Sequence, residues 1–135
     1  MSRNNLQAYF HIVFHTKHGE KVIDIKLHYK LYGFIWNQCE SMELLPIAIN
    51  GTENHIHVLL KAHSKITIAT IVQGIKGASS RWLNEIGNFV KPFNWQRGYG
   101  LFTVSPKDVE LITNYIKKQK EHHNQGSVRA EWEKS

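Results

Sequence analysis

The sequence predicts an α+β fold in which one antiparallel sheet carries helices. Four short segments are rich in β-branched and aromatic residues, and three others repeat apolar residues at helical spacing. Their order is strand, helix, strand, strand, helix, strand, helix. The first six elements match the split βαβ, ferredoxin-like arrangement, in which both helices cover the same face of the sheet.

The first half of the chain supplies three strands and one helix. A strand is expected over residues 7–16, followed by a glycine-containing turn at Lys17–Glu20. A helix is expected from about Ile25 to Met42, because its apolar residues recur every three or four positions. Strands are expected at Glu43–Asn50 and His55–Ala62, and the segment "NGTEN" supplies Asn-Gly turn chemistry before the second of them, which predicts an antiparallel hairpin.

The second half supplies the remaining elements. A helix is expected over Thr67–Ile86, where Gly74 and Gly77 indicate either close backbone packing or a short break. A strand at Gly98–Ser105 leads into a helix from Pro106 to about Asn124, since Ser-Pro suits a helix start. This helix is a seventh element in addition to the six of the split βαβ arrangement, so it must lie at an edge of the sheet or on its other face. The inner stripes are expected to be Ile68, Ile71, Val72, Ile75 and Leu83 in the first of these helices, and Val109, Ile112 and Ile116 in the second.

Composition limits the class of protein. The 135 residues suit a single domain, 1–135, with a tail from about residue 125 that is loosely ordered apart from a short helix near Trp132. The formal charge of +6 favours acidic partners, nucleic acid first. Cys39 is the only cysteine, which excludes an intrachain disulfide and a multi-cysteine zinc site. No apolar run is long enough for a membrane span, so a soluble, cytoplasmic protein without membrane partners is expected.

Two histidines lie one residue apart in the third strand. Side chains alternate along a strand, so His55 and His57 share one face while Ile56 and Val58 pack on the opposite one. Two neutral imidazoles at this spacing can bind one divalent cation. Judged by spacing alone, two exposed histidines without a function are the simpler interpretation.

The last helix adds two polar groups. Tyr115 and Gln119 are four residues apart and therefore share a helix face beside the inner stripe. Gln119 can offer a carbonyl oxygen to a hard cation, and Tyr115 can present its hydroxyl to a group polarised by that cation. A tyrosine that borders the core with its hydroxyl in water is the alternative.

Together these residues resemble the IS200/IS605-type single-tyrosine transposases of the HUH endonuclease superfamily. The resemblance rests on His55-Ile56-His57, on Tyr115 and Gln119 in "YIKKQ", and on the segments "FHIVFHTK", "GIKGASSRW" and "WQRGYGLFTVS". It implies a ferredoxin-like, RRM-related fold with a C-terminal catalytic helix. It also implies a homodimer in which one chain's tyrosine helix serves the partner's histidines.

The activity implied is cleavage and rejoining of single-stranded DNA at hairpin-bearing ends of a mobile element. Tyr115 would be the nucleophile and form a 5′-phosphotyrosine, while His55, His57 and Gln119 would hold Mg²⁺ or Mn²⁺. Relatives often place a carboxylate directly before the first histidine, where this chain has Asn54. Glu53, one residue earlier, is therefore a possible assisting residue, although a solvated turn residue is the simpler interpretation. His122 lies one turn past Gln119 and could help to remove the Tyr115 proton, although phosphate binding or exposure to water is the simpler interpretation of it.

DNA contacts are expected from basic residues, which bind phosphates without reading sequence. Trp95 and Tyr99 could stack on unpaired bases, although burial of Trp95 is an equal alternative. Other functions considered are a REP-associated domesticated transposase and a non-catalytic single-stranded nucleic-acid-binding module. The basic residues proposed for DNA binding are Lys17, Lys76, Arg81, Arg97, Lys117 and Lys118.

Overall fold

The computed structural model describes residues 5–120 and 130–134. A single antiparallel sheet of four strands, in the order β2-β3-β1-β4, forms the centre of the described chain. This is the strand order of the split βαβ arrangement, so the predicted fold class is confirmed. The strands are β1 (Ala8–His15), β2 (Leu45–Gly51), β3 (His55–Ala62) and β4 (Gly100–Val104).

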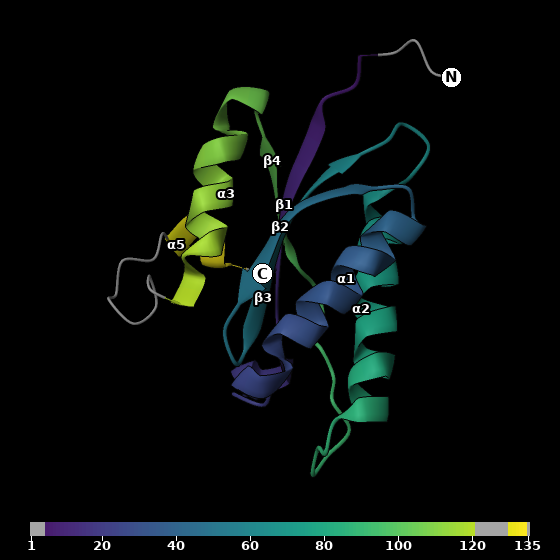
Figure 1. Ribbon diagram of the computed structural model, residues 1–135, viewed down its shortest axis with the longest axis vertical. Coiled ribbons are helices and arrows are strands. Elements are labelled where there is room, and N and C mark those ends of the chain that lie inside the picture. The colour runs from purple at the N-terminus through teal and green to yellow at the C-terminus, as the bar shows by residue number, and fades with distance from the viewer. Residues whose placement is uncertain (1–4, 121–129, 135) are drawn as a thin grey trace.

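Helices cover both faces of this sheet (Figure 1). The long helices α1 (His28–Ser41) and α2 (Ile68–Ile86) lie side by side on one face. The short helices α3 (Val109–Lys117) and α5 (Ala130–Glu133) lie on the other. The extra helix therefore takes the second sheet face and covers the side on which the two histidines lie.

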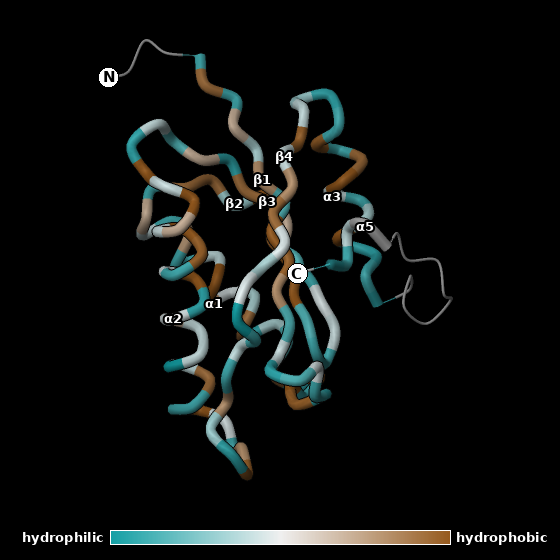
Figure 2. The backbone as a smooth tube through the Cα atoms, turned by 180° about the vertical axis from the view of Figure 1, so that it is seen from behind, coloured by the Kyte–Doolittle hydropathy of each residue, from teal (hydrophilic) through white to brown (hydrophobic). Residues whose placement is uncertain are grey.

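Strand alternation divides the core into two clusters. Along β3, Ile56, Val58 and Leu60 point toward α1 and α2, while Leu59 points toward α3. Hydrophobic stretches accordingly run along the central strands, between the two helical layers (Figure 2). The smaller cluster seats α3 on the sheet and consists of Ala48, Leu59, Val104, Ile112 and Ile116. No helix among the described residues is long and apolar enough to cross a bilayer.

The structure of helix α2 shows whether its two glycines allow close packing or mark a break. Thr67 caps it by accepting a hydrogen bond from Thr70 N, and the helix runs unbroken through Gly74 and Gly77. A Cβ on Gly74 would lie 2.6 Å from Met42 Sδ, whereas one on Gly77 would meet nothing within 4 Å. Close packing is therefore the reason for the first glycine only. The predicted inner stripe is wrong at Ile68, which is exposed at the helix start.

The hairpin turn lies one step later than predicted. Asn50 and Gly51 belong to the end of β2, and the turn is formed by residues 52–54, with Thr52 N donating to His55 O. A Cβ on Gly51 would overlap the carbonyl oxygen of His55, so the glycine allows the two strands to approach.

The last helix is interrupted rather than continuous. A 3-10 turn at Pro106–Asp108 precedes α3, and the Ser105 side chain makes no capping bond. Helix α3 ends at Lys117, whose carbonyl accepts a hydrogen bond from Asn50 Nδ2 at 3.0 Å. Because Lys118 then leaves the regular helical conformation, Gln119 belongs to a separate helical segment. The part of the prediction beyond Lys120 lies outside the described residues.

The C-terminal tail was expected to be loosely ordered. Residues 121–129 lie outside the described part of the chain, so that prediction stays open. The expected short helix near Trp132 is present as α5, and Trp132 packs against the cluster under α3.

Candidate metal and nucleophile site

The third strand positions His55 and His57 on the sheet face covered by α3 and α5. The two side chains are 3% and 0% exposed, so both imidazoles are withdrawn from bulk water. Their ring centroids lie 5.2 Å apart at an interplanar angle of 74°. The predicted shared face is therefore present, but it is enclosed rather than open.

Tyr115 reaches the same place from α3, and Gln119 reaches it from the helical segment that follows Lys118. Gln119 is fully buried, and its Oε1 lies 3.3 Å from His55 Nε2. The Tyr115 ring is nearly buried and lies 6.0 Å, centroid to centroid, from the His57 ring. The structure thus brings all four predicted site residues together within one chain. Their roles as nucleophile and metal ligands stay predictions.

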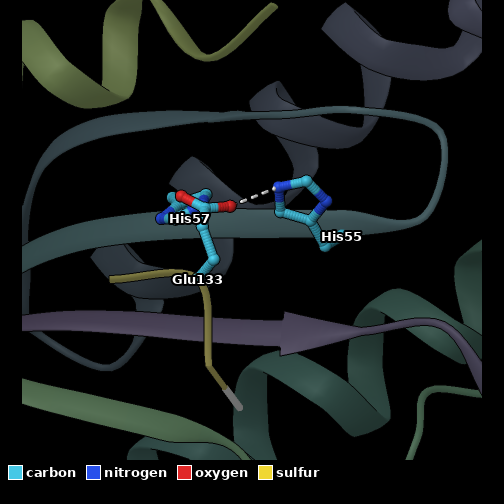
Figure 3. A group of neighbouring side chains, drawn as sticks. All are labelled: His55, His57 and Glu133. Carbon is cyan, nitrogen blue, oxygen red and sulfur yellow. Dashed lines mark hydrogen bonds and ion pairs between the residues drawn. The ribbon is translucent and has the colours of Figure 1, made fainter. Parts of the chain in front are cut away.

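A fifth residue, Glu133, completes the cluster and was not predicted from the sequence. Its Oε1 lies 3.0 Å from His55 Nε2 and 3.1 Å from His57 Nε2 (Figure 3). Its Oε2 accepts a hydrogen bond from the Tyr115 hydroxyl at 2.5 Å and one from Gln119 Nε2 at 3.5 Å. A single carboxylate therefore connects the paired imidazoles with the phenol.

The environment keeps Glu133 ionised. Burial by itself would raise the pKa of this carboxyl group, but hydrogen bonds with His55 and His57 outweigh burial and lower the pKa below its usual range. The site therefore holds a carboxylate, which is the form that binds cations.

The turn before β3 determines how His55 is protonated. Asn54 Nδ2 donates to Gly19 O at 3.2 Å, which fixes the orientation of the amide and turns Asn54 Oδ1 toward the ring. Asn54 Oδ1 lies 2.8 Å from His55 Nδ1 and also accepts from Thr52 Oγ1. A carbonyl oxygen can only accept, so His55 Nδ1 must carry a proton. In the neutral ring, Nε2 then presents its lone pair to the site.

Several electron-pair donors thus converge on one point. The His55 Nε2 edge, a Glu133 oxygen and Gln119 Oε1 face one another, and either an Nε2 proton or a metal ion between them makes this arrangement favourable. Ligands at about 2.1 Å from an octahedral ion lie about 3.0 Å apart along each edge. The separations of 3.0, 3.1 and 3.3 Å fit that value. The donor atoms of His55, His57 and Glu133 lie within 4.8 Å of one another. The residues therefore fit a divalent cation.

Lys120 fastens the segment that carries Gln119. Its Nζ donates to Asn50 Oδ1 at 2.9 Å and to Gly51 O at 3.1 Å, and it lies over the Tyr32 ring. Partial burial lowers the pKa of this lysine. These bonds tie the segment to the end of β2, where Asn50 pairs with His57 across the sheet. The contacts of Lys120 thus hold the adjacent Gln119 in its buried position.

Of the two assisting residues predicted from the sequence, Glu53 lies among the described residues. Glu53 is exposed in the hairpin turn, and its backbone carbonyl accepts from Ile23 N. The carboxylate close to the histidines belongs to Glu133 instead. His122 lies outside the described residues.

The basic residues proposed for DNA binding are mostly exposed. Lys76 differs, because its Nζ donates to Gln96 O and Gly98 O and thereby holds the loop before β4. Trp95 is buried and donates to Ser79 Oγ, so it cannot stack on a base, whereas Tyr99 is exposed. The five remaining exposed cations are Lys17, Arg81, Arg97, Lys117 and Lys118.

Comparison with known proteins identifies the family of this chain. The family model described as "Transposase IS200 like" matches residues 4–119. The transposases for insertion sequence element IS200 from Salmonella typhimurium (strain LT2) and Salmonella typhi are each 28% identical to the chain over 122 residues. Those alignments cover 87% of this chain and 80% of each relative.

Solved structures share the fold. A candidate transposase from Deinococcus radiodurans R1 aligns with a TM-score of 0.70 and 23% identity, over 88% of this chain and 96% of that one. A REP-associated tyrosine transposase bound to a REP hairpin aligns with a TM-score of 0.64 and 13% identity, over 95% and 74%. Because the family model spans residues 4–119 and the relatives align over most of their length, the chain belongs to the IS200/IS605-type single-tyrosine transposases.

Proposed function

We propose that this transposase cleaves and rejoins single-stranded DNA at hairpin-bearing ends, with Tyr115 as its nucleophile. The observation that carries the proposal is the position of one carboxylate, that of Glu133. It touches both imidazoles through Oε1 and the Tyr115 hydroxyl through Oε2. An anionic group thus lies between the candidate metal ligands and the nucleophile, which is where a scissile phosphate has to lie.

Four side chains would hold the metal ion. His55 and His57 supply nitrogen donors, and Gln119 and Glu133 supply oxygens. When bound, Mg²⁺ or Mn²⁺ would act as a Lewis acid toward a non-bridging phosphate oxygen. The set of two imidazoles, one amide and one carboxylate suits Mn²⁺ at least as well as Mg²⁺, because imidazole is a more usual ligand of transition-metal ions than of Mg²⁺.

Tyr115 would perform the covalent chemistry. Its oxygen forms a bond to phosphorus while the bond from phosphorus to the 3′ oxygen breaks. The phenol loses its proton and the departing 3′ oxygen gains one, so the products are a 5′-phosphotyrosine and a free 3′-hydroxyl. Attack by the 3′-hydroxyl of another end reverses these changes and releases Tyr115. The phosphodiester energy is kept in the covalent bond, so neither water nor ATP is consumed.

Hairpin DNA is the proposed substrate. Support comes from the structural neighbour that is bound to a REP hairpin and from the chain's formal charge of +6. The exposed cations would bind backbone phosphates without reading sequence. A REP-associated role on chromosomal repeats is the second candidate, favoured by the same neighbour.

The decisive experiment measures covalent adducts with single-stranded hairpin oligonucleotides in the presence and absence of Mg²⁺ or Mn²⁺. Tyr115→Phe should keep hairpin binding and abolish the adduct, because the ring packing stays and only the hydroxyl is lost. Tyr29→Phe is the matched control, since Tyr29 is 83% exposed on α1, on the opposite face of the sheet. Adducts formed by the Tyr115→Phe variant would exclude Tyr115 as the nucleophile.

An experiment can distinguish whether Glu133 is a metal ligand or a side chain that only blocks the site. If Glu133 is a ligand, Glu133→Gln should weaken Mn²⁺ binding by roughly tenfold or more and slow adduct formation. If the carboxylate only blocks the site, the same variant should leave Mn²⁺ affinity unchanged and speed adduct formation. Glu110→Gln, an exposed change on α3, is the control.

We further propose that the active form is a homodimer with shared sites, as the family resemblance implies. Mixing Tyr115→Phe with His57→Ala tests this, because each variant lacks one half of the site. Exchange of helices between chains would restore one intact site per mixed dimer, and adducts would appear. The arrangement within one chain described above would give none.

A further inference from the structure

His11 is a buried histidine to which neither the His-Ile-His motif nor the proposed chemistry assigns a role. It lies on β1, the strand next to β3, and is 0% exposed. Its Nε2 lies 2.7 Å from Nδ1 of His57, with the ring planes 28° apart and the centroids 5.0 Å apart. The two imidazoles thus meet edge to edge and nearly in one plane, which is the geometry of a direct ring-to-ring hydrogen bond.

The other edge of His57 faces the metal donors. Its Nε2 lies 3.1 Å from Glu133 Oε1, so His57 Nε2 is the atom that would bind the ion. A coordinating nitrogen must offer a lone pair, so a neutral His57 would carry its proton on Nδ1. That proton points at His11 Nε2, which must then act as the acceptor.

His11 Nε2 is placed to accept this proton, and aromatic side chains enclose the rest of the ring. Phe102 and Trp132 pack against the His11 ring. His11 Nδ1 has no hydrogen-bond partner among the described residues, so Nε2 makes the one polar contact of this ring there.

From this geometry we infer that His11 is a positioning residue that holds His57 in the tautomer and orientation needed to bind the divalent ion. This inference rests on the proposed metal site. It parallels the contact on the other ligand, where Asn54 Oδ1 accepts from His55 Nδ1. Each imidazole of the pair would thus be held through its Nδ1, that of His55 by an amide and that of His57 by a third histidine. Outer partners of this kind typically change metal affinity by roughly 10- to 100-fold when they are lost.

The test measures Mn²⁺ affinity by calorimetry on the full chain without DNA. His11→Phe keeps a ring and removes the acceptor, so affinity should fall by roughly 10- to 100-fold. His11→Gln offers an amide oxygen in place of Nε2 and should recover most of the loss. Phe102→Leu disturbs the packing around the same ring without touching the hydrogen bond, and it should leave affinity within about threefold of wild type.

A second measurement needs no substitution. Nitrogen NMR of the wild-type chain with diamagnetic Mg²⁺ should show His57 protonated at Nδ1 and unprotonated at Nε2. An unprotonated Nδ1, or unchanged affinity in the His11→Phe variant, would overturn the role of His11 alone. A wild-type chain that binds no divalent ion would overturn the metal site and, with it, this inference.

Discussion

Ile116 offers a test of how α3 is held on the sheet. The side chain is 0% exposed and belongs to the cluster with Leu59 and Val104. Ile116→Ala removes three carbon groups, each contributing about 0.8 kcal/mol when buried, which gives about 2.4 kcal/mol of lost transfer free energy. The remaining cavity adds to this, so the free energy of unfolding should fall by about 2.5–4 kcal/mol.

Urea titration of the full chain, followed by tryptophan fluorescence, measures this difference. The dependence of the free energy of unfolding on urea concentration should keep the same slope, while the urea concentration at the midpoint falls. Leu111→Ala is the control on the same helix, because Leu111 is 49% exposed, and it should change stability by no more than about 0.5 kcal/mol. A loss below about 1 kcal/mol for Ile116→Ala would show that α3 does not pack on the sheet through this residue.

Three further predictions concern the helical layer on the opposite face. Gly77→Ala should raise the free energy of unfolding by about 0.5–1 kcal/mol in urea titrations, since alanine favours helices and its Cβ meets nothing within 4 Å; a loss of stability would mean that α2 does not run unbroken there. Ser79→Ala should lower the free energy of unfolding by about 1–3 kcal/mol in the same titrations, because the buried Trp95 Nε1 loses its hydrogen-bond acceptor. An unchanged stability would mean that another group accepts this hydrogen bond. Cys39 should resist alkylation by iodoacetamide at about pH 8 in the native chain and react in urea, since burial raises the pKa of its thiol to about 12; rapid native labelling would contradict its burial.

The fold was predictable because its signals are local. Alternation in the third strand and helical spacing in α2 each depend on residues within a few positions, and these elements appear within one residue of the expected ends. The errors occur at positions that contact residues distant in the sequence. The helix expected over Pro106 to about Asn124 is interrupted after Lys117, where Asn50, far away in sequence, binds the Lys117 carbonyl. No spacing rule within the helix contains that information.

The site was predictable to the same extent. His55 and His57 follow from strand alternation, and Tyr115 with Gln119 from helical spacing together with the family resemblance. Glu133 carries no such signal, because it lies 76 residues after His57 in a polar tail and is one of several glutamates there. Its proximity depends on how α5 docks, and Trp132 is the apolar residue that docks it. In hindsight, a lone tryptophan in a polar tail was the available clue to that docking.

Stability and chemistry depend on the same helix face in this fold. Ile112 and Ile116 seat α3 on the sheet, and Tyr115 occupies the position between them that points toward His57. A rotation of α3 that improved packing of its isoleucines would therefore move the phenol away from the imidazoles. The register of α3 is in turn limited at its far end, where Asn50 binds the Lys117 carbonyl and Lys120 binds the end of β2. Because β2 and β3 form one hairpin, the elements that fix the proposed nucleophile also fix the strand that carries the proposed metal ligands. A loss of packing under α3 should consequently weaken metal binding before it unfolds the sheet.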